Sequence, residues 1–301
     1  MNKINLSKID TEQRNPNSTH IDQTDTKGIL TIINNEDAKI AQAVQAKIPV
    51  ITKVIDLIFP RFNQGGRLIY MGAGSSGRIG ILDASEMLPT YGLDADRIVG
   101  IIAGGDSAIR TPAEGAEDDQ DLAVNDLKKL NLQPLLDTVI GIGASGRTPY
   151  VLAGLKYAKT IGALSVGLCM TKNSEMIAIA DEVIAIETGP EVITGSTRMK
   201  AGTATKLVCN MISTTLMVKL GKVYQNLMVD LVATNEKLKV RTAEIVKAVT
   251  NASDEVIAQA LTAANYACKN AIVMILKNVS YVESQTLLTK YDNLVSKIIN
   301  E

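Results

Sequence analysis

Gly72-Ala-Gly-Ser-Ser-Gly-Arg78 is a glycine-rich turn that directly follows a short apolar run, Arg67–Met71. The apolar run is typical of a buried strand, and a helical pattern follows the turn. A helix that begins at such a turn presents unpaired backbone N–H groups and the positive end of its dipole to an anion. The stretch therefore predicts a strand, a turn and a helix arranged around an anion site.

The same motif occurs again in Gly141-Ile-Gly-Ala-Ser-Gly-Arg147, which overlaps the end of a second apolar run, Thr138–Ile142. We call Gly72–Arg78 the first cradle and Gly141–Arg147 the second cradle. A single glycine-rich turn is weak evidence for a binding site, whereas two that share a serine and an arginine are much stronger. Hydroxyl groups and a guanidinium suit a terminal phosphate monoester.

The Gly-x-Gly-x-x-Gly spacing of the first cradle also allows a dinucleotide-binding interpretation. That interpretation requires an acidic residue about 20 residues further on, at the end of the next strand. Asp94 and Asp96 precede the next predicted strand, and Gly104-Gly-Asp106 follows it as a second turn. The pattern therefore disfavours a nicotinamide or flavin cofactor.

Apolar runs and helical patterns alternate along the middle of the chain. We predict strands over 67–71, 97–103, 138–142, 163–168 and 182–187, and helices over 77–87, 115–129, 148–160 and 174–179. Short connections between strands and helices are typical of a parallel sheet covered on both faces. The sequence therefore predicts an α/β fold, a three-layer αβα sandwich with a five-stranded parallel sheet.

Four segments follow from the same patterns. We expect an N-terminal arm and helices over 1–57, an α/β domain with both cradles over 58–221, a connecting helix over 222–250 and a small helical domain over 251–301. The arm shows no hydrophobic period before Asn34, and two helices over 37–59 are expected to break near Pro49. In the last segment, the sequence pattern predicts helices over 253–264, 267–278 and 281–298.

Composition narrows the classes of function. The chain has 31 basic and 32 acidic residues, so neither a nucleic acid nor an anionic membrane is an expected partner. The single histidine, His20, lies in the polar arm, which argues against a His-rich metal site and against a Ser-His-Asp device. Proton transfer near neutral pH then falls to carboxylates, lysine, tyrosine or water.

Cysteine spacing and hydropathy indicate a compartment. The three cysteines lie in apolar surroundings without a Cys-x-x-Cys spacing, as expected of reduced core residues. The polar N-terminal stretch lacks the apolar region of a secretory signal, and no apolar run is long enough for a membrane span. We therefore expect a cytoplasmic protein.

A Gly- and Thr-rich stretch, Thr188–Thr203, leads into a helical pattern over 204–220. Ser196, Thr197 and Lys200 place donor groups where that helix begins, which predicts a third wall of the anion pocket. An ordinary linker with helix-capping residues is the alternative.

Carboxylates lie near both predicted strand ends. Glu86 lies in the helix after the first cradle, and the next strand is followed by a loop with Glu114, Glu117, Asp118 and Asp119. Because the carboxyl ends of parallel strands face one crevice, both stretches could reach a bound ligand. Acidic residues near a helix N-terminus are also ordinary partners of the helix dipole, so spacing alone does not choose among them.

Several separate motifs together resemble the N-acetylmuramic acid 6-phosphate etherases, a family of the sugar isomerase (SIS) domain superfamily. The similarity covers about residues 5–245 and rests on Thr11-Glu-Gln-Arg-Asn-Pro-Asn-Ser18, Gly72–Arg78, Asp83-Ala-Ser-Glu86, Ala103-Gly-Gly-Asp106, Gly143–Pro149 and Gly195–Thr203. The resemblance implies a flavodoxin-like SIS fold and a lyase that releases D-lactate from N-acetylmuramate 6-phosphate, giving N-acetylglucosamine 6-phosphate. It implies no metal and no organic cofactor.

The family's acid and base map onto two glutamates of this chain. The resemblance implies that Glu86 is the proton donor and Glu117 the base. The expected substrate-binding residues are Ser75, Ser76, Arg78, Ser145, Gly146, Arg147, Thr148, Ser196, Thr197 and Lys200. Lys200 is a candidate for the lactyl carboxylate, and each cradle arginine has an alternative as a helix-surface residue paired with an acid.

Two other functions fit the same pocket. One is a sugar-phosphate sensor that regulates a kinase, as in a related regulatory protein, and it would tolerate loss of both glutamates. The other is an aldose–ketose phosphate isomerase, which needs a carboxylate base but no acid for a leaving group. We further expect a homodimer in which the N-terminal arm crosses to the partner subunit.

Overall fold

The computed structural model describes residues 10–231, 233 and 235–300. The first nine residues of the predicted arm lie outside this range. The chain forms two compact units. The first runs to Ser85 and continues over Asp96–Ile212, and the second comprises Glu86–Ala95 and the chain from Ser213. The boundaries of the four predicted segments stay a prediction.

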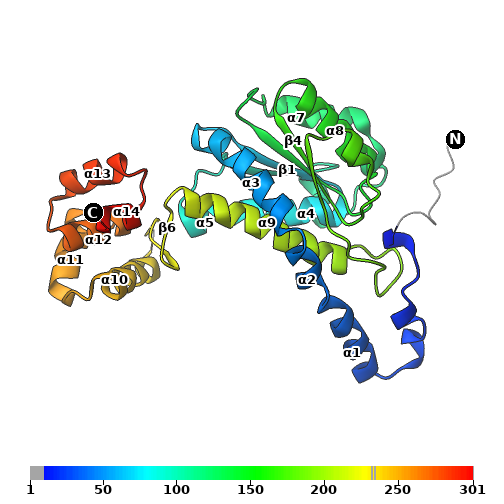
Figure 1. Cartoon of the computed structure of the whole chain (residues 1–301), viewed down its shortest axis with the longest axis horizontal. Helices are drawn as coiled ribbons and strands as arrows, with labels where there is room; N and C mark the ends of the chain where they lie inside the picture. The colour runs from blue at the N-terminus through cyan, green and yellow to red at the C-terminus, as the bar shows by residue number, and fades with distance from the viewer. Residues whose placement is uncertain (1–9, 232, 234, 301) are drawn as a thin grey trace. The chain divides into compact units, whose positions relative to one another are not determined.

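A five-stranded parallel sheet forms the centre of the first unit, with strand order β2-β1-β3-β4-β5 (Figure 1). The strands are β1 (Leu68–Gly72), β2 (Ile98–Ile102), β3 (Thr138–Ile142), β4 (Leu164–Cys169) and β5 (Glu182–Ala185). In the register, Gly72 lies beside both Ile102 and Ile142. The carboxyl ends of the three neighbouring strands therefore meet at one edge, and the predicted fold class is confirmed.

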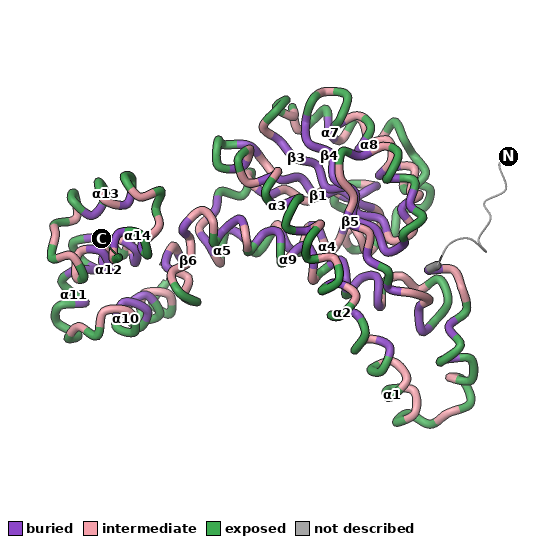
Figure 2. Tube along the Cα trace, viewed as in Figure 1, coloured by how far each residue is buried: buried purple, intermediate pink, exposed green. Residues whose placement is uncertain are grey.

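Side chains of the strands alternate between two helical layers. Ile69 and Met71 pack with α7 (Gln120–Lys129) and α8 (Pro149–Thr160) in one apolar core. Tyr70 points to the other face, where it lies against Gly80 of α4 (Gly74–Ser85). The same face carries α3 (Ile48–Asn63) and the first part of α9 (Lys200–Lys219), whose Cys209 carbonyl oxygen accepts from the Tyr70 hydroxyl. Figure 2 shows the central strands β1, β3 and β4 as buried.

The N-terminal region is more helical than its sequence pattern indicates. Short 3-10 turns at Asp10–Glu12, Pro16–Ser18 and Ile21–Gln23 are followed by α1 (Thr26–Asp37) and α2 (Ile40–Gln45). Helix α1 lies in the stretch expected to lack a hydrophobic period. The expected break near Pro49 is present, because α3 begins at Ile48 with this proline in its first turn.

The second unit is mostly helical. It contains α5 (Met87–Tyr91), a short hairpin of β6 (Val223–Tyr224) and β7 (Leu227–Met228), and the helices α10 (Glu236–Thr250), α11 (Asp254–Ala263), α12 (Cys268–Lys277), α13 (Tyr281–Lys290) and α14 (Val295–Ile299). The expected connecting helix over 222–250 begins only at Glu236. The helix expected over 281–298 divides because Asp292 and Asn293 adopt positive φ angles of 55° and 61°.

Two further properties concern the described part of the chain as a whole. None of its helices is both long and apolar enough to cross a bilayer. No group of three or more His, Cys, Asp or Glu side chains within it is arranged to hold a metal ion.

Candidate active site

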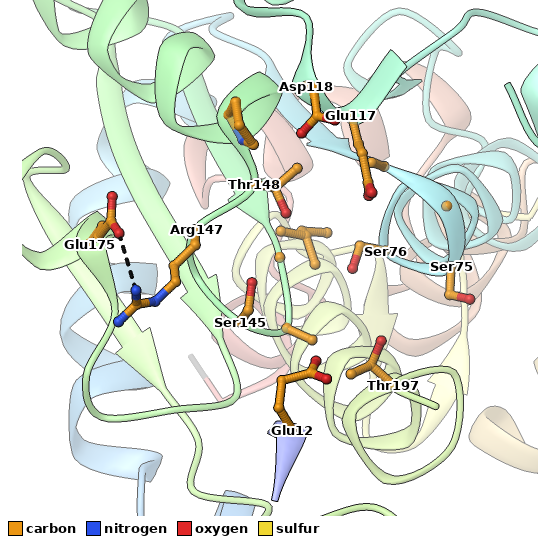
Figure 3. Close-up of a pocket in the computed structure, with 16 residues that line it drawn as sticks. Glu12, Ser75, Ser76, Glu117, Asp118, Ser145, Arg147, Thr148, Glu175 and Thr197 are labelled. Atoms are coloured by element: carbon orange, nitrogen blue, oxygen red, sulfur yellow. Dashed lines mark ion pairs between the residues drawn. The ribbon is translucent and has the colours of Figure 1, made fainter. Parts of the chain in front are cut away.

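A cavity of about 490 Å³ opens where β1 and β3 end. Residues from six separate stretches of the first unit line it: Glu12, Ala73, Gly74, Ser75, Ser76, Glu117, Asp118, Ile142, Gly143, Ala144, Ser145, Arg147, Thr148, Pro149, Glu175 and Thr197. Figure 3 shows hydroxyl groups in its middle and carboxylates at its margins. The structure thus brings both cradles to one cavity.

The first cradle depends on close backbone packing. A Cβ atom on Gly72 would lie 2.8 Å from the backbone nitrogen of Gly77, and one on Gly77 would lie 2.7 Å from the Gly72 carbonyl oxygen. This approach lets α4 begin immediately at the end of β1. Ser75 and Ser76 therefore lie in the first turn of α4, where the helix dipole favours an anion, although the Ser76 N–H already donates to the Ala73 carbonyl oxygen at 3.1 Å.

The second cradle presents its hydroxyl groups from the loop before α8. Gly146 adopts a φ of +66°, and a Cβ there would lie 2.0 Å from the Ser174 hydroxyl oxygen. The tight turn places Ser145 and Thr148 in the cavity lining. Arg147 lines the cavity as well, but its guanidinium lies 3.5 Å from the Glu175 carboxylate. This pairing leaves two hydroxyl groups as neutral donors, that of Ser145 in the second cradle and that of Thr148 directly after it.

Glu117 reaches the cavity from a 3-10 turn, Ala116–Asp118, between β2 and α7. Gly115 precedes the turn with a φ of 73°. Asp119 follows it and caps α7 by accepting the N–H of Leu122 at 2.8 Å. The loop thus has a fixed C-terminal end, and the exposed Glu117 carboxylate faces the cavity from the side of Ser76 (Figure 3).

Two family models match this chain, the glucokinase regulatory protein N-terminal SIS domain over residues 50–159 and the SIS domain over residues 129–215. The chain is also 61% identical over 301 residues to the N-acetylmuramic acid 6-phosphate etherase of Mycoplasma mycoides subsp. mycoides SC. That match covers 100% of this chain and 99% of the relative. The chain belongs to the N-acetylmuramic acid 6-phosphate etherase family.

A second etherase, from Caldanaerobacter subterraneus subsp. tengcongensis, is 53% identical and covers 98% of this chain and 96% of its own length. Among solved structures, a phosphoheptose isomerase from Neisseria gonorrhoeae matches with a TM-score of 0.47 and 13% identity. That match covers 64% of this chain and 100% of the isomerase. Family membership in the etherases therefore rests on the full-length relatives.

Arg78 is not in the lining of the main cavity of this etherase-family chain. Its Nε donates to the carbonyl oxygen of Ile109 and its Nη2 to that of Ala108, both at 2.7 Å. These carbonyls belong to α6 (Ser107–Arg110), in the loop that carries Glu117. Arg78 borders a neighbouring cavity of about 350 Å³. The structure thus places this expected substrate ligand as a support of the loop.

The position of Lys200 is also not the one expected of a residue that binds the lactyl carboxylate of an etherase substrate. Its side chain is 2% exposed, and its Nζ lies 2.7 Å from a carboxylate oxygen of Glu36 in α1. Asn15 and Asn17 donate to the same carboxylate at 2.9 and 2.8 Å, and Lys39 pairs with it. Because this ammonium is buried and paired, Lys200 ties α9 to α1 and to the arm.

Hydrogen bonds strongly stabilise the ionised form of the Glu36 carboxylate. Burial opposes ionisation of Glu36, but hydrogen bonds from Lys200, Lys39 and the two asparagines lower its pKa to about 2. Glu191 accepts the backbone N–H groups of Lys200 and Ala201 at 2.9 Å, although burial raises the pKa of its carboxyl. Two buried acids, Glu36 and Glu191, thus hold the start of α9. Of the two hydroxyl residues predicted just before this helix, Thr197 lines the cavity and Ser196 does not.

Glu86, the acid that the etherase resemblance implies, is absent from the cavity lining. It follows Ser85 at the end of α4, and its exposed side chain makes no capping hydrogen bond to α5. Helix α4 runs from Gly74 to Ser85, so its end lies about 16 Å from its start at 1.5 Å per residue. The helix that begins at the first cradle therefore ends well away from it, and Glu86 belongs to the second unit.

Glu12 is a cavity residue that sequence reasoning missed. It ends the 3-10 turn Asp10–Glu12 and lies beside Thr197, facing the hydroxyl groups from the margin opposite Glu117 (Figure 3). The only signal in the sequence was the arm motif Thr11–Ser18. That motif indicated a resemblance but did not indicate where the arm would lie.

Proposed function

We propose that this protein is a carbon–oxygen lyase that cleaves the D-lactyl ether of N-acetylmuramic acid 6-phosphate, yielding N-acetylglucosamine 6-phosphate and D-lactate. The observation that carries the proposal is the 61% identity to an etherase over the full chain. The cavity agrees with it, because two cradles rich in hydroxyl groups suit a sugar phosphate and a carboxylate faces them. The reaction belongs to amino-sugar catabolism, which we place in the cytoplasm.

The chemistry requires a base and an acid. In the open-chain sugar, the C1 aldehyde acidifies the C2 proton, which Glu117 removes. The electron pair forms a C2–C3 double bond as the C3–oxygen bond breaks, and Glu86 protonates the departing lactate oxygen. Water then adds to C3, and a proton returns to C2, so the overall change is hydrolysis of the ether. Each positioned acid or base typically contributes about 10²–10⁴-fold.

The phosphate lies far from the reacting carbons and serves as an anchor. Ser75 and Ser76 in the first turn of α4, together with Ser145 and Thr148, provide the hydroxyl donors that we assign to it and to the neighbouring sugar oxygens. Gly146 contributes the tight turn of the second cradle, and Arg147 and Thr197 border the site. Binding energy from this unreacting group positions C2 and C3 for the reaction.

A direct assay distinguishes the etherase from its alternatives. Purified protein incubated with N-acetylmuramic acid 6-phosphate is expected to release D-lactate and N-acetylglucosamine 6-phosphate in equal amounts, followed by a D-lactate dehydrogenase assay. A sensor would bind the sugar phosphate without turnover. An isomerase would interconvert an aldose and a ketose phosphate without releasing lactate. Absence of lactate would overturn the proposal.

We further propose that the protein is a homodimer in which one subunit supplies Glu117 and the other supplies Glu86 to each site. Helix α4 extends about 16 Å from the first cradle before Glu86 follows it in the sequence, and Glu86 is not in the cavity lining. Helix α1 has an exposed surface that a partner subunit could cover, because Glu36 is its only buried residue and Leu30 is 62% exposed. Within this chain, Asn15 and Ser18 of the arm donate to the carbonyl oxygens of Pro190 and Val192. Crossing of the arm to a partner subunit therefore stays a prediction.

Mixing two inactive variants tests the shared site. Glu86→Gln and Glu117→Gln chains, dissociated and reassembled together, are expected to regain about a quarter of the wild-type activity, because half of the random dimers are mixed and each mixed dimer has one intact site. Each variant taken through the same procedure alone is the control, and sedimentation measures the dimer. A mixture as inactive as its components would contradict a site shared between subunits.

A further inference from the structure

We propose that Glu12 binds the sugar part of the substrate, accepting hydrogen bonds from its hydroxyl or N–H groups, and so selects sugar phosphates over inorganic phosphate. This inference rests on the proposed function for the identity of the sugar. Glu12 is half-buried in the cavity wall. Its carboxylate faces the hydroxyl groups of the cradles from the margin opposite Glu117 (Figure 3).

The arm holds Glu12 in place through anchors on both of its sides. Thr11 is fully buried. Asn15 donates to Glu36 at 2.9 Å and to the Pro190 carbonyl oxygen at 3.1 Å, and Ser18 donates to the Val192 carbonyl oxygen at 2.7 Å. Because the backbone is already fixed in this way, binding a ligand orders the Glu12 side chain but does not have to order the arm.

The loop opposite Glu12 leaves room for its carboxylate. Gly195 adopts a φ of +76°, and a Cβ atom there would lie 3.2 Å from Oε2 of Glu12. Among the described residues, no hydrogen bond or ion pair engages the Glu12 carboxylate. An ionised carboxylate only accepts hydrogen bonds. Glu12 is therefore available to a donor that enters the cavity.

The chemistry of the substrate divides its groups between the two parts of the cavity. The phosphate and the lactyl carboxylate are anions that Glu12 repels, whereas the sugar hydroxyl groups and the acetamido N–H are donors that it attracts. Glu12 thus favours an orientation in which the anions point to the cradles and the donors face the arm. Inorganic phosphate offers no such donors beyond its own acidic protons and gains nothing from Glu12.

The test compares two ligands on one set of variants. Calorimetric titration of Glu12→Gln with N-acetylglucosamine 6-phosphate is expected to show affinity reduced by about tenfold to a hundredfold, the usual effect of losing a hydrogen bond to a charged group. Affinity for inorganic phosphate is expected to be unchanged or slightly higher, because a negative charge is removed. Asp22→Asn, an exposed acid of the same arm outside the cavity lining, is the matched control.

The pattern of results separates the explanations. An equal loss of affinity for both ligands would assign Glu12 a structural role and overturn the proposal, as would wild-type affinity of Glu12→Gln for the sugar phosphate. Partial recovery in Glu12→Asp supports a direct contact, because that variant keeps the charge and shortens the reach. Failure of the wild-type protein to release lactate would overturn the etherase proposal alone, since the binding comparison does not depend on turnover.

Discussion

Replacing Glu117 with glutamine is expected to lower kcat for lactate release by about 10²–10⁴-fold and to change KM by less than about threefold. Glutamine keeps the size of the side chain and its place in the cavity lining but has no basic oxygen of comparable strength. The cradles that anchor the phosphate are untouched, so ground-state binding persists. Steady-state kinetics with a coupled D-lactate assay measures both constants.

Proton exchange at C2 gives a second and more specific measurement of the same variant. In deuterated water the wild-type protein is expected to return product with deuterium at C2, and Glu117→Gln is expected to lose this exchange together with turnover. Asp121→Asn, an exposed acid in the first turn of the following helix, is the control. Full turnover by Glu117→Gln beside an active wild-type protein would refute the assignment of the base.

Replacing Lys200 with methionine is expected to destabilise the first unit by about 3 kcal/mol, because the change leaves the Glu36 carboxylate buried without its closest buried cation. Lys39, Asn15 and Asn17 still donate to Glu36, which places the expected loss at the lower end of the usual range for a broken buried pair. Urea unfolding followed by circular dichroism measures the free energy of unfolding.

Two further variants separate the buried charge from the loss of packing. Glu36→Gln combined with Lys200→Met is expected to be more stable than Lys200→Met alone, because no unpaired charge remains. Lys53→Met removes a cation that is 62% exposed from its pair with Glu182 and is expected to change stability by less than about 1 kcal/mol. Equal losses of unfolding free energy in Lys200→Met and Lys53→Met would show that the buried ion pair contributes no more to stability than the exposed one.

The sheet and the cradles could be predicted because their signals are local. An apolar run of strand length and the glycines after it depend on neighbours within a few residues, as at Gly72 and Gly77. The strand pattern then fixed which ends meet, since parallel strands place their carboxyl ends together. Ser75, Ser76, Ser145, Thr148 and Glu117 were accordingly expected near one cavity, and the structure places them in its lining.

The remaining features depend on contacts between distant parts of the chain. Lys200 meets Glu36 across a separation of 164 residues, and nothing next to either residue indicates the other. A lysine beside hydroxyl groups at a helix start resembles an anion ligand whether or not a buried acid has already paired with it. Glu12 was missed for the same reason, because its arm lies on a loop that follows it by more than 170 residues.

The same separation has a consequence for the order of events during synthesis. The arm leaves the ribosome first, yet the carbonyl groups and the ammonium that hold it belong to residues 190, 192 and 200. At a synthesis rate of about 5–20 residues per second, on the order of ten seconds pass between synthesis of the arm and synthesis of the residues on which it docks. Docking of the arm is therefore a late step of folding, and until it occurs the nascent chain has a sheet and two cradles but no completed cavity wall.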